Sequence, residues 1–255
     1  MDRFGLIGHP IAHSSSPALF SAAYGGRYVY DLIQTPDFGQ AWARFLAEYK
    51  AINVTAPFKG DAFARADWKS PECERVGATN LVVKTPEGTR AYNSDYLGVK
   101  SLLEPLGRGS AAVIGYGGAG KAAALAAAEM GYATTVMNRT SSKAEKFVEG
   151  LPEYGFRVAP VSSFREELRK ADLLIYALPM ALESFAELVP EDFSSKPVVL
   201  EANYRAPAFS GLLRARMLDA GAQYLPGGLW LVNQAVSGYS VMTGETPDIE
   251  ALVSL

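Results

Sequence analysis

Three glycines in the second half of the chain have the spacing of a phosphate-binding loop. An apolar run, residues 111–114, precedes them, and an alanine-rich run, residues 122–130, follows. A backbone that turns tightly beside a pyrophosphate needs glycine, and the free N–H groups of a following helix attract phosphate. The strand–loop–helix context predicts a dinucleotide site, whereas the alternative is a purely structural turn. The loop residues are Gly115, Gly117, Gly118, Ala119 and Gly120, and the glycines fit G-x-G-x-x-G.

The end of the next apolar run predicts which dinucleotide is bound. NAD-binding sheets carry an Asp or Glu about here for the ribose 2′-hydroxyl, but this chain reads Asn138-Arg139-Thr140, with Lys143 a turn later. A cation suits a 2′-phosphate, which a carboxylate would repel. We therefore expect NADP. The alternative is a solvated helix start with Arg139 and Lys143 merely exposed.

Polar residues also gather in three short segments of the first half: 13–17, 53–59 and 93–98. They offer hydroxyls, one amine and one carboxylate, which suit a polyhydroxylated acid. The only histidines are His9 and His13, too few for a metal site without further ligands, so we expect no metal.

The elements that position these groups follow from apolar patterning. After residue 110 strands and helices alternate, which is typical of a doubly wound parallel sheet. We expect an N-terminal α/β substrate domain (1–100), onto which helices in 229–255 pack back, and a Rossmann NADP-binding domain (101–228), with a cleft between them. The expected strands are 3–7, 27–32, 51–54, 81–84, 89–92, 111–114, 133–138, 173–177 and 198–201. The first expected helix begins near Pro17. The others cover residues 38–49, 96–106, 118–130, 141–148, 229–242 and 249–255.

Composition narrows the class of protein. The 255 residues carry a net charge of −3 without a basic run, which argues against nucleic acid or an anionic membrane as partner. One cysteine cannot form an internal disulfide, and the N-terminus does not read as a signal peptide, so we expect a cytoplasmic protein. Its size is compatible with a monomer or a homodimer.

The sequence closely resembles the shikimate dehydrogenase family over almost its whole length. The motifs that carry the resemblance are Gly8–Pro17, Asn53–Lys59, Gly77–Asn80, Asn93–Asp95, the Gly115 loop, Asn138–Thr140, Asn203–Pro207 and Asn233–Ala235. The resemblance implies reversible, NADPH-dependent reduction of 3-dehydroshikimate to shikimate, a step toward chorismate and the aromatic amino acids.

The resemblance also implies residue roles. Lys59 and Asp95 would flank the reacting hydroxyl as the catalytic pair, and Gly227 would lie near the nicotinamide. The implied substrate ligands are Ser14, Ser16, Thr55, Asn80, Tyr204 and Gln234. The chemistry agrees, because oxidising a secondary alcohol needs a hydride acceptor at carbon and a proton acceptor at oxygen, which a lysine can provide.

Plainer interpretations exist for the same residues. Lys59 could be an exposed lysine after a proline turn, while Ser16 and Asp95 could simply cap helices. The chain also departs from the family pattern: residues 176–180 read Tyr-Ala-Leu-Pro-Met where hydroxyl-bearing residues are usual, and Glu201 replaces an Asp. These changes put the nicotinamide-side contacts in doubt.

Two other functions stay open from sequence alone. One is a quinate/shikimate dehydrogenase of dual specificity, which the paired serines Ser14 and Ser16 and the cation Arg139 argue against. The other is a non-catalytic NADP-binding sensor, which retention of Lys59 and Asp95 argues against.

Overall fold

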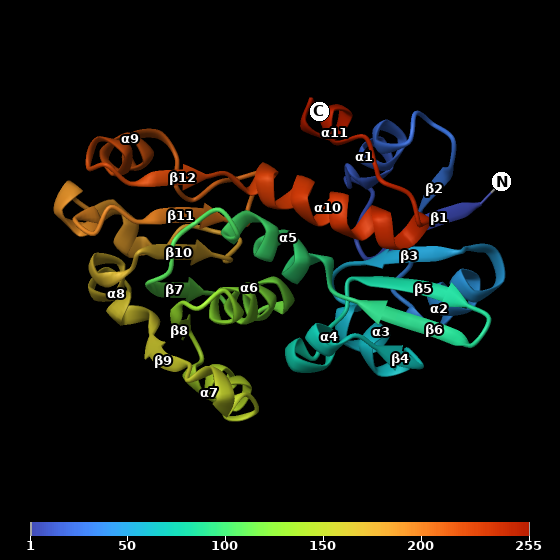
Figure 1. Ribbon diagram of the computed structural model, residues 1–255, viewed down its shortest axis with the longest axis horizontal. Coiled ribbons are helices and arrows are strands. Elements are labelled where there is room, and N and C mark those ends of the chain that lie inside the picture. The colour runs from blue at the N-terminus through green and yellow to red at the C-terminus, as the bar shows by residue number, and fades with distance from the viewer. Residues whose placement is uncertain (1, 255) are drawn as a thin grey trace. The chain divides into compact units, whose positions relative to one another are not determined.

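The computed structural model describes residues 2–254, and these fall into two compact units (Figure 1). Unit 1 comprises residues 1–98 and 234–255, and unit 2 comprises residues 99–233. The chain passes from one unit to the other within two helices, α5 (Ser94–Leu103) and α10 (Gly227–Thr243). None of the described helices combines the length and apolar character needed to cross a membrane.

Unit 1 is built on a mixed six-stranded sheet in the order β2-β1-β3-β5-β6-β4. β1 runs parallel to β2 and β3, β5 is antiparallel to β3 and β6, and β4 is parallel to β6. β5 and β6 form an antiparallel hairpin, which confirms the strands expected at 81–84 and 89–92. The strands are β1 (Arg3–Gly8), β2 (Val29–Gln34), β3 (Ala51–Val54), β4 (Trp68–Lys69), β5 (Leu81–Thr85) and β6 (Gly88–Tyr92).

Both faces of this sheet are covered. On one face, Ile7, Ile52 and Val82 pack against Trp42 and Phe45 of α2, because alternate residues of a strand point to the same side. On the other face lies an aromatic group made of Phe4, Phe20, Tyr24, Tyr28, Tyr30 and Tyr239. The helices are α1 (Ser16–Ala23), α2 (Phe38–Glu48), α3 (Lys59–Arg65), α4 (Pro71–Val76) and α11 (Ile249–Val253).

Unit 2 is a parallel six-stranded sheet in the order β12-β11-β10-β7-β8-β9. Read from the other edge this is 3-2-1-4-5-6, the order of the Rossmann dinucleotide-binding fold, which confirms the predicted fold class. The strands are β7 (Ser110–Ile114), β8 (Ala133–Asn138), β9 (Arg157–Pro160), β10 (Leu173–Tyr176), β11 (Val198–Glu201) and β12 (Gln223–Leu225).

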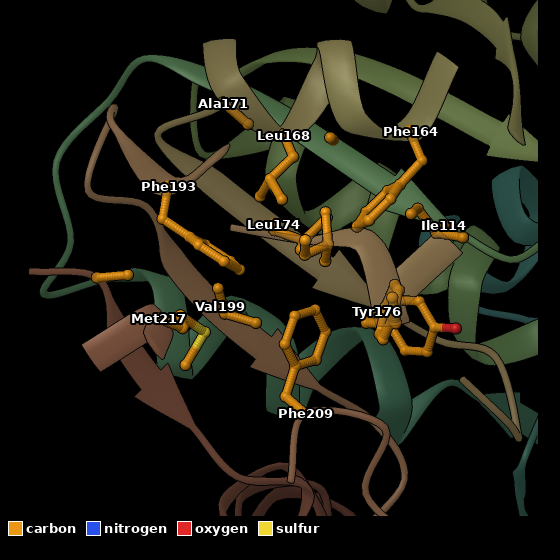
Figure 2. Packing of buried hydrophobic residues seen from close by; sticks show 14 of the residues in the cluster. Ile114, Phe164, Leu168, Ala171, Leu174, Tyr176, Phe193, Val199, Phe209 and Met217 are labelled. Carbon is orange, nitrogen blue, oxygen red and sulfur yellow. The ribbon is translucent and has the colours of Figure 1, made fainter. Parts of the chain in front are cut away.

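The helices of unit 2 bury the two faces of its sheet differently. The alanines of α6, residues 122–124 and 126–127, are fully buried, so this helix packs closely on the strands. The opposite face is covered by large side chains, many of them aromatic, with Phe164, Tyr176 and Phe209 around Leu174 (Figure 2). The helices are α6 (Gly118–Glu129), α7 (Ser141–Glu149), α8 (Phe164–Lys170) and α9 (Gly211–Asp219), with 3₁₀ turns at Pro152–Tyr154, Val161–Ser163, Glu183–Glu187 and Pro190–Phe193.

Several element boundaries differ from those predicted. The strand predicted at 27–32 is β2 (Val29–Gln34), because its register on β1 pairs Val29 with Arg3. The helix predicted at 96–106 begins two residues earlier and ends at Leu103. The predicted helix end at Leu255 lies outside the described residues, and α11 ends at Val253.

Candidate active site

The polar segments of unit 1 meet at one edge of its sheet because of strand direction. β1 and β3 are parallel, so Gly8 at the end of β1 and Thr55 just after β3 emerge side by side, and the Thr55 amide donates to Ile7 O (2.9 Å). β5 is antiparallel to β3, so the residue that precedes it, Asn80, joins the same edge, and its carbonyl accepts from the Val54 amide (2.8 Å). The end of β6 brings Asn93 there as well.

A lysine–aspartate pair lies at this edge. Lys59, the first residue of α3, donates from Nζ to Asp95 Oδ2 at 2.5 Å. Asp95 is buried, whereas the Lys59 side chain keeps 24% of its exposure. The plainer interpretation of Lys59 as an ordinary surface lysine is therefore wrong. A partly desolvated ammonium held against a carboxylate can pass a proton to and from a hydroxyl.

Asp95 is not the cap of its helix, so that alternative is also wrong. The helix begins at Ser94, and the Tyr96 amide donates to Asn93 Oδ1 (3.1 Å), so Asn93 satisfies the free amide. Asn93 in turn donates to Ala78 O (3.1 Å). The carboxylate of Asp95 is thereby left for Lys59.

Asn80 is fixed by the same helix start. Its Oδ1 accepts from the Ser94 amide (2.7 Å) and its Nδ2 donates to Ser94 Oγ (3.0 Å). Asn80 and Ser94 are both buried, so this two-way pairing locks the strand edge to the first turn of α5. The hydroxyl of Ser94 is thus used structurally.

Ser14 and Ser16 form one unit at the start of α1. Ser14 Oγ donates to Ser16 Oγ (3.0 Å) and accepts from the Ser16 amide (3.2 Å). The N-cap position belongs to Ser15, and Ser16 is the first helical residue, so the expected cap role of Ser16 is wrong. Two adjacent hydroxyls next to a helix N-terminus are suited to an anion such as a carboxylate.

Gln234 is brought to the same part of unit 1 by close helix packing. A Cβ on Gly98 would lie 2.6 Å from the Gln234 amide nitrogen, and one on Gly238 would lie 3.1 Å from Ser94 Cβ. α10 therefore crosses α5 directly over the turn that carries Asp95. Glycine is needed at Gly98 for this approach, because a Cβ there would meet backbone.

Sequence reasoning missed two members of this edge. Tyr30 on β2 donates from its hydroxyl to Asn53 Oδ1 (2.8 Å), and the Ser16 side chain lies close enough to this hydroxyl to lower its pKa. Asn53 donates from Nδ2 to Asn80 O (3.3 Å). A signal for Asn53 existed, since it stands two residues before Thr55 at the end of a strand. No signal marked Tyr30, because it lies within an apolar strand pattern.

The glycine loop of unit 2 has the geometry that a pyrophosphate requires. Gly115 has φ +107°, which favours glycine, and a Cβ on Gly120 would lie 2.0 Å from Gly115 O. Gly117 is exposed at the N-cap of α6, and a Cβ on it would meet no protein atom within 4 Å. The loop's own backbone therefore requires glycine at Gly115 and Gly120. Gly117, Gly118 and Ala119 line the open helix end, where phosphates bind.

The end of β8 carries the two cations expected for a 2′-phosphate. Arg139 and Lys143 are exposed, and within residues 2–254 neither forms an ion pair. Asn138 folds back to donate to Thr140 O (2.9 Å), which shapes the turn into α7. Thr140 stands at the N-cap but makes no side-chain capping bond, so its hydroxyl is available. These residues fit the adenosine end of NADP.

The segment that departs from the family pattern has become part of the core. Tyr176 is fully buried against Phe185 and Phe209, as Figure 2 shows for Phe209, and its hydroxyl donates to Met180 O (2.6 Å). Burial and nearby Glu201 raise the pKa of Tyr176 well above its ordinary value. Asn203 donates to Pro179 O (3.0 Å). The 177–182 loop is therefore held through its own carbonyls.

Tyr204 and Gly227 both lie in unit 2, close to each other. Tyr204 is 42% exposed in the loop after β11, and Gly227 is the first residue of α10. A Cβ on Gly227 would lie 2.7 Å from the Tyr204 amide nitrogen, so glycine lets α10 start against this loop. The loop is anchored by the buried Glu201 carboxylate, which accepts from the Ala208 amide and from Tyr224 Oη (2.7 Å).

A sheet edge with a lysine–aspartate pair and a separate dinucleotide-binding unit are the parts of a pyridine-nucleotide-dependent dehydrogenase. Comparison with known proteins gives the family. Residues 6–82 match the model of the shikimate dehydrogenase substrate binding domain, and residues 99–184 match that of shikimate / quinate 5-dehydrogenase. The chain belongs to the shikimate dehydrogenase family.

Relatives match over nearly their full length. Shikimate dehydrogenase (NADP(+)) of Thermus thermophilus is 34% identical over 97% of this chain and 95% of its own. The enzyme of that name from Halorubrum lacusprofundi is 36% identical over 99% and 97%. A crystal structure of shikimate 5-dehydrogenase from Thermus thermophilus in complex with NADP(H) and shikimate matches with a TM-score of 0.85 and 32% identity, covering 100% of this chain and 98% of that one.

Proposed function

We propose that this chain catalyses the reversible reduction of 3-dehydroshikimate to shikimate with NADPH. The observation that carries the proposal is the Lys59–Asp95 pair, at 2.5 Å, on the sheet edge that also holds Ser14, Ser16 and Asn80. Membership in the shikimate dehydrogenase family supports the same substrate.

The residues of unit 1 divide the work of binding. The paired hydroxyls of Ser14 and Ser16 bind the substrate carboxylate, with help from Thr55. Asn80 and Gln234 bind the remaining hydroxyls or the carboxylate, a role that the family resemblance also implies for Tyr204. Each hydrogen bond to the charged carboxylate contributes about 1.5–3 kcal/mol.

The proton is handled by Lys59. In the reducing direction its ammonium, oriented by Asp95, donates a proton to the carbonyl oxygen and stabilises the negative charge that develops there. In the oxidising direction the amine takes the proton from the hydroxyl. When bound, NADPH supplies the hydride that the carbonyl carbon accepts.

Unit 2 holds the cofactor in this proposal. Gly117, Gly118 and Ala119 receive the pyrophosphate at the start of α6, and Gly115 lets the loop turn beside it. Asn138, Arg139, Thr140 and Lys143 receive the adenosine 2′-phosphate. Gly227 lies on the nicotinamide side. We place the enzyme in the cytoplasm, where its single thiol stays reduced.

A spectrophotometric assay with four combinations tests the proposal: shikimate or quinate, each with NADP or NAD. The expected result is turnover with shikimate and NADP that exceeds each other combination by at least about tenfold. Comparable rates with quinate would favour dual specificity. Calorimetric binding of NADP without turnover of either acid would favour a sensor and refute the proposal.

A further inference from the structure

The hydroxyl of Tyr30 lies between two groups of the candidate site that come from different elements. It donates to Asn53 Oδ1 (2.8 Å) on β3, and the Ser16 side chain at the start of α1 lies close enough to act on it. Because the Tyr30 proton is engaged by Asn53, its oxygen is free to accept from Ser16. Tyr30 thus faces two elements of the site at once.

Polar contacts around Tyr30 follow the sheet edge. Ser14 donates to Ser16 (3.0 Å), the Ser16 side chain faces the Tyr30 hydroxyl, Tyr30 donates to Asn53, and Asn53 donates to Asn80 O (3.3 Å). Asn80 is then paired in both directions with Ser94, the neighbour of Asp95. The serines predicted for the carboxylate are thereby linked to the strand edge that carries the Lys59–Asp95 pair.

The ring and the hydroxyl of Tyr30 have separate tasks. The ring packs in the aromatic group, with centroids 4.7 Å from Phe20 and 6.4 Å from Tyr239. This packing needs no oxygen. Burial, with Tyr239 nearby, raises the pKa of Tyr30 well above its ordinary value, so the phenol stays protonated and can donate throughout the working pH range.

We propose that Tyr30 is a positioning residue, whose hydroxyl fixes the orientation of Ser16 and Asn53 and so preorganises the site for the substrate carboxylate. This inference rests on the proposed function. An unrestrained serine hydroxyl samples three rotamers, and restricting it before binding lowers the cost of forming the bound geometry.

Tyr30→Phe tests the proposal, because it removes only the oxygen and keeps the ring. A net hydrogen-bond contribution of about 1 kcal/mol corresponds to roughly a fivefold change. We expect KM for shikimate to rise about three- to tenfold, while kcat stays within about twofold and KM for NADP is unchanged. A merely structural role would lower Tm without this selective rise in KM.

Tyr24→Phe is the matched control. Tyr24 belongs to the same aromatic group, 5.1 Å from Phe20, but its hydroxyl bonds Thr243 Oγ1 (2.8 Å) and Glu245 O (3.2 Å). It loses the same atom from the same cluster away from the candidate site. We expect its KM for shikimate to equal that of the wild type.

Ser16→Ala, alone and combined with Tyr30→Phe, shows whether Tyr30 acts through Ser16. If it does, the double variant raises KM by clearly less than the product of the two single effects. Wild-type activity is measured first, because its absence would refute the proposed function itself. With wild-type activity present, an unchanged KM in Tyr30→Phe, or fully multiplicative effects, would overturn this inference alone.

Discussion

Gly117 and Gly120 lie three residues apart in the cofactor loop, yet substitution by alanine should lower stability at Gly120 and cofactor binding at Gly117. A Cβ on Gly120 would lie 2.0 Å from Gly115 O and 2.8 Å from Gly115 C, which are backbone atoms that a rotamer change cannot move. A Cβ on Gly117 would meet no protein atom within 4 Å, and its φ of −67° suits any residue. One glycine serves the fold, whereas the other leaves room for a ligand.

The magnitudes follow from these contacts. Overpacking against backbone costs about 3 kcal/mol, and the better helix propensity of alanine offsets up to about 1 kcal/mol. Gly120→Ala should therefore lose about 2 kcal/mol, a fall in Tm of roughly 4–8 °C. Gly117→Ala should keep the wild-type Tm within about 2 °C, because an unstrained surface change lies within about 0.5 kcal/mol.

Binding should separate the two variants further. If the open space at Gly117 receives the pyrophosphate, Gly117→Ala should weaken NADP binding at least about tenfold, since its methyl group occupies that space. Thermal denaturation without ligand and calorimetric titration with NADP measure the two effects. Wild-type NADP affinity in Gly117→Ala, or wild-type Tm in Gly120→Ala, would refute the reasoning.

Three further predictions concern charges in unit 2. Arg139→Ala should raise KM for NADP about tenfold without changing KM for NAD, because Arg139 is exposed and unpaired among the described residues. Glu201→Ala should lower Tm by roughly 6–12 °C, since the amides of Ala208 and Phe209 and Tyr224 Oη lose their acceptor at a cost of about 3 kcal/mol, whereas Glu201→Gln should lose less. Asp192→Asn should be less stable than wild type by about 1–2 kcal/mol at pH 7, and the difference should shrink below pH 4.

The sign of the last prediction follows from the surroundings of Asp192. Burial alone would raise its pKa, but hydrogen bonds from Arg165 and the Val189 amide and the charges of Arg165 and Arg169 outweigh burial, so its pKa lies below 3.8. A carboxylate with a depressed folded-state pKa contributes stability above its unfolded pKa, and that stability is lost as the pH falls through the folded value. Chemical denaturation at pH 7, 5 and 3 measures it, and a constant difference would contradict the account.

The predictions for Arg139→Ala and Glu201→Ala have their own controls and contradicting outcomes. Lys146→Ala removes a cation from the same helix as Lys143 but from its last turn, and should leave both cofactor constants unchanged. If Arg139→Ala changes KM for NADP and NAD equally, the cation does not read the 2′-phosphate. A wild-type Tm in Glu201→Ala would show that the loop after β11 does not depend on this carboxylate.

Strands with a clear apolar run could be predicted from the sequence, and β3, β8 and β11 have the predicted bounds. Elements without a clear pattern could not be predicted. β12 has three residues and α3 only seven, too few to show a period, and both form because neighbouring elements supply their hydrogen bonds or packing.

The candidate site shows the same limit. Lys59 and Asp95 are 36 residues apart, so spacing cannot bring them together, and only the family resemblance suggested the pair. The sheet pairing brings them together, because β5 and β6 fold back beside β3. Tyr30 escaped prediction because it looks like one more aromatic residue of a strand, and only its side-chain direction gives it a polar role.

The central claim is that Lys59, held by Asp95, moves the proton of the substrate hydroxyl. The most direct test is kcat for shikimate oxidation by Lys59→Ala, with Lys50→Ala as a control that removes a lysine from an exposed pair with Asp2 (3.1 Å). The account predicts a fall in kcat of about 10²- to 10⁴-fold in Lys59→Ala with NADP affinity unchanged, and wild-type kcat in Lys50→Ala. A kcat of Lys59→Ala within about tenfold of wild type would contradict it.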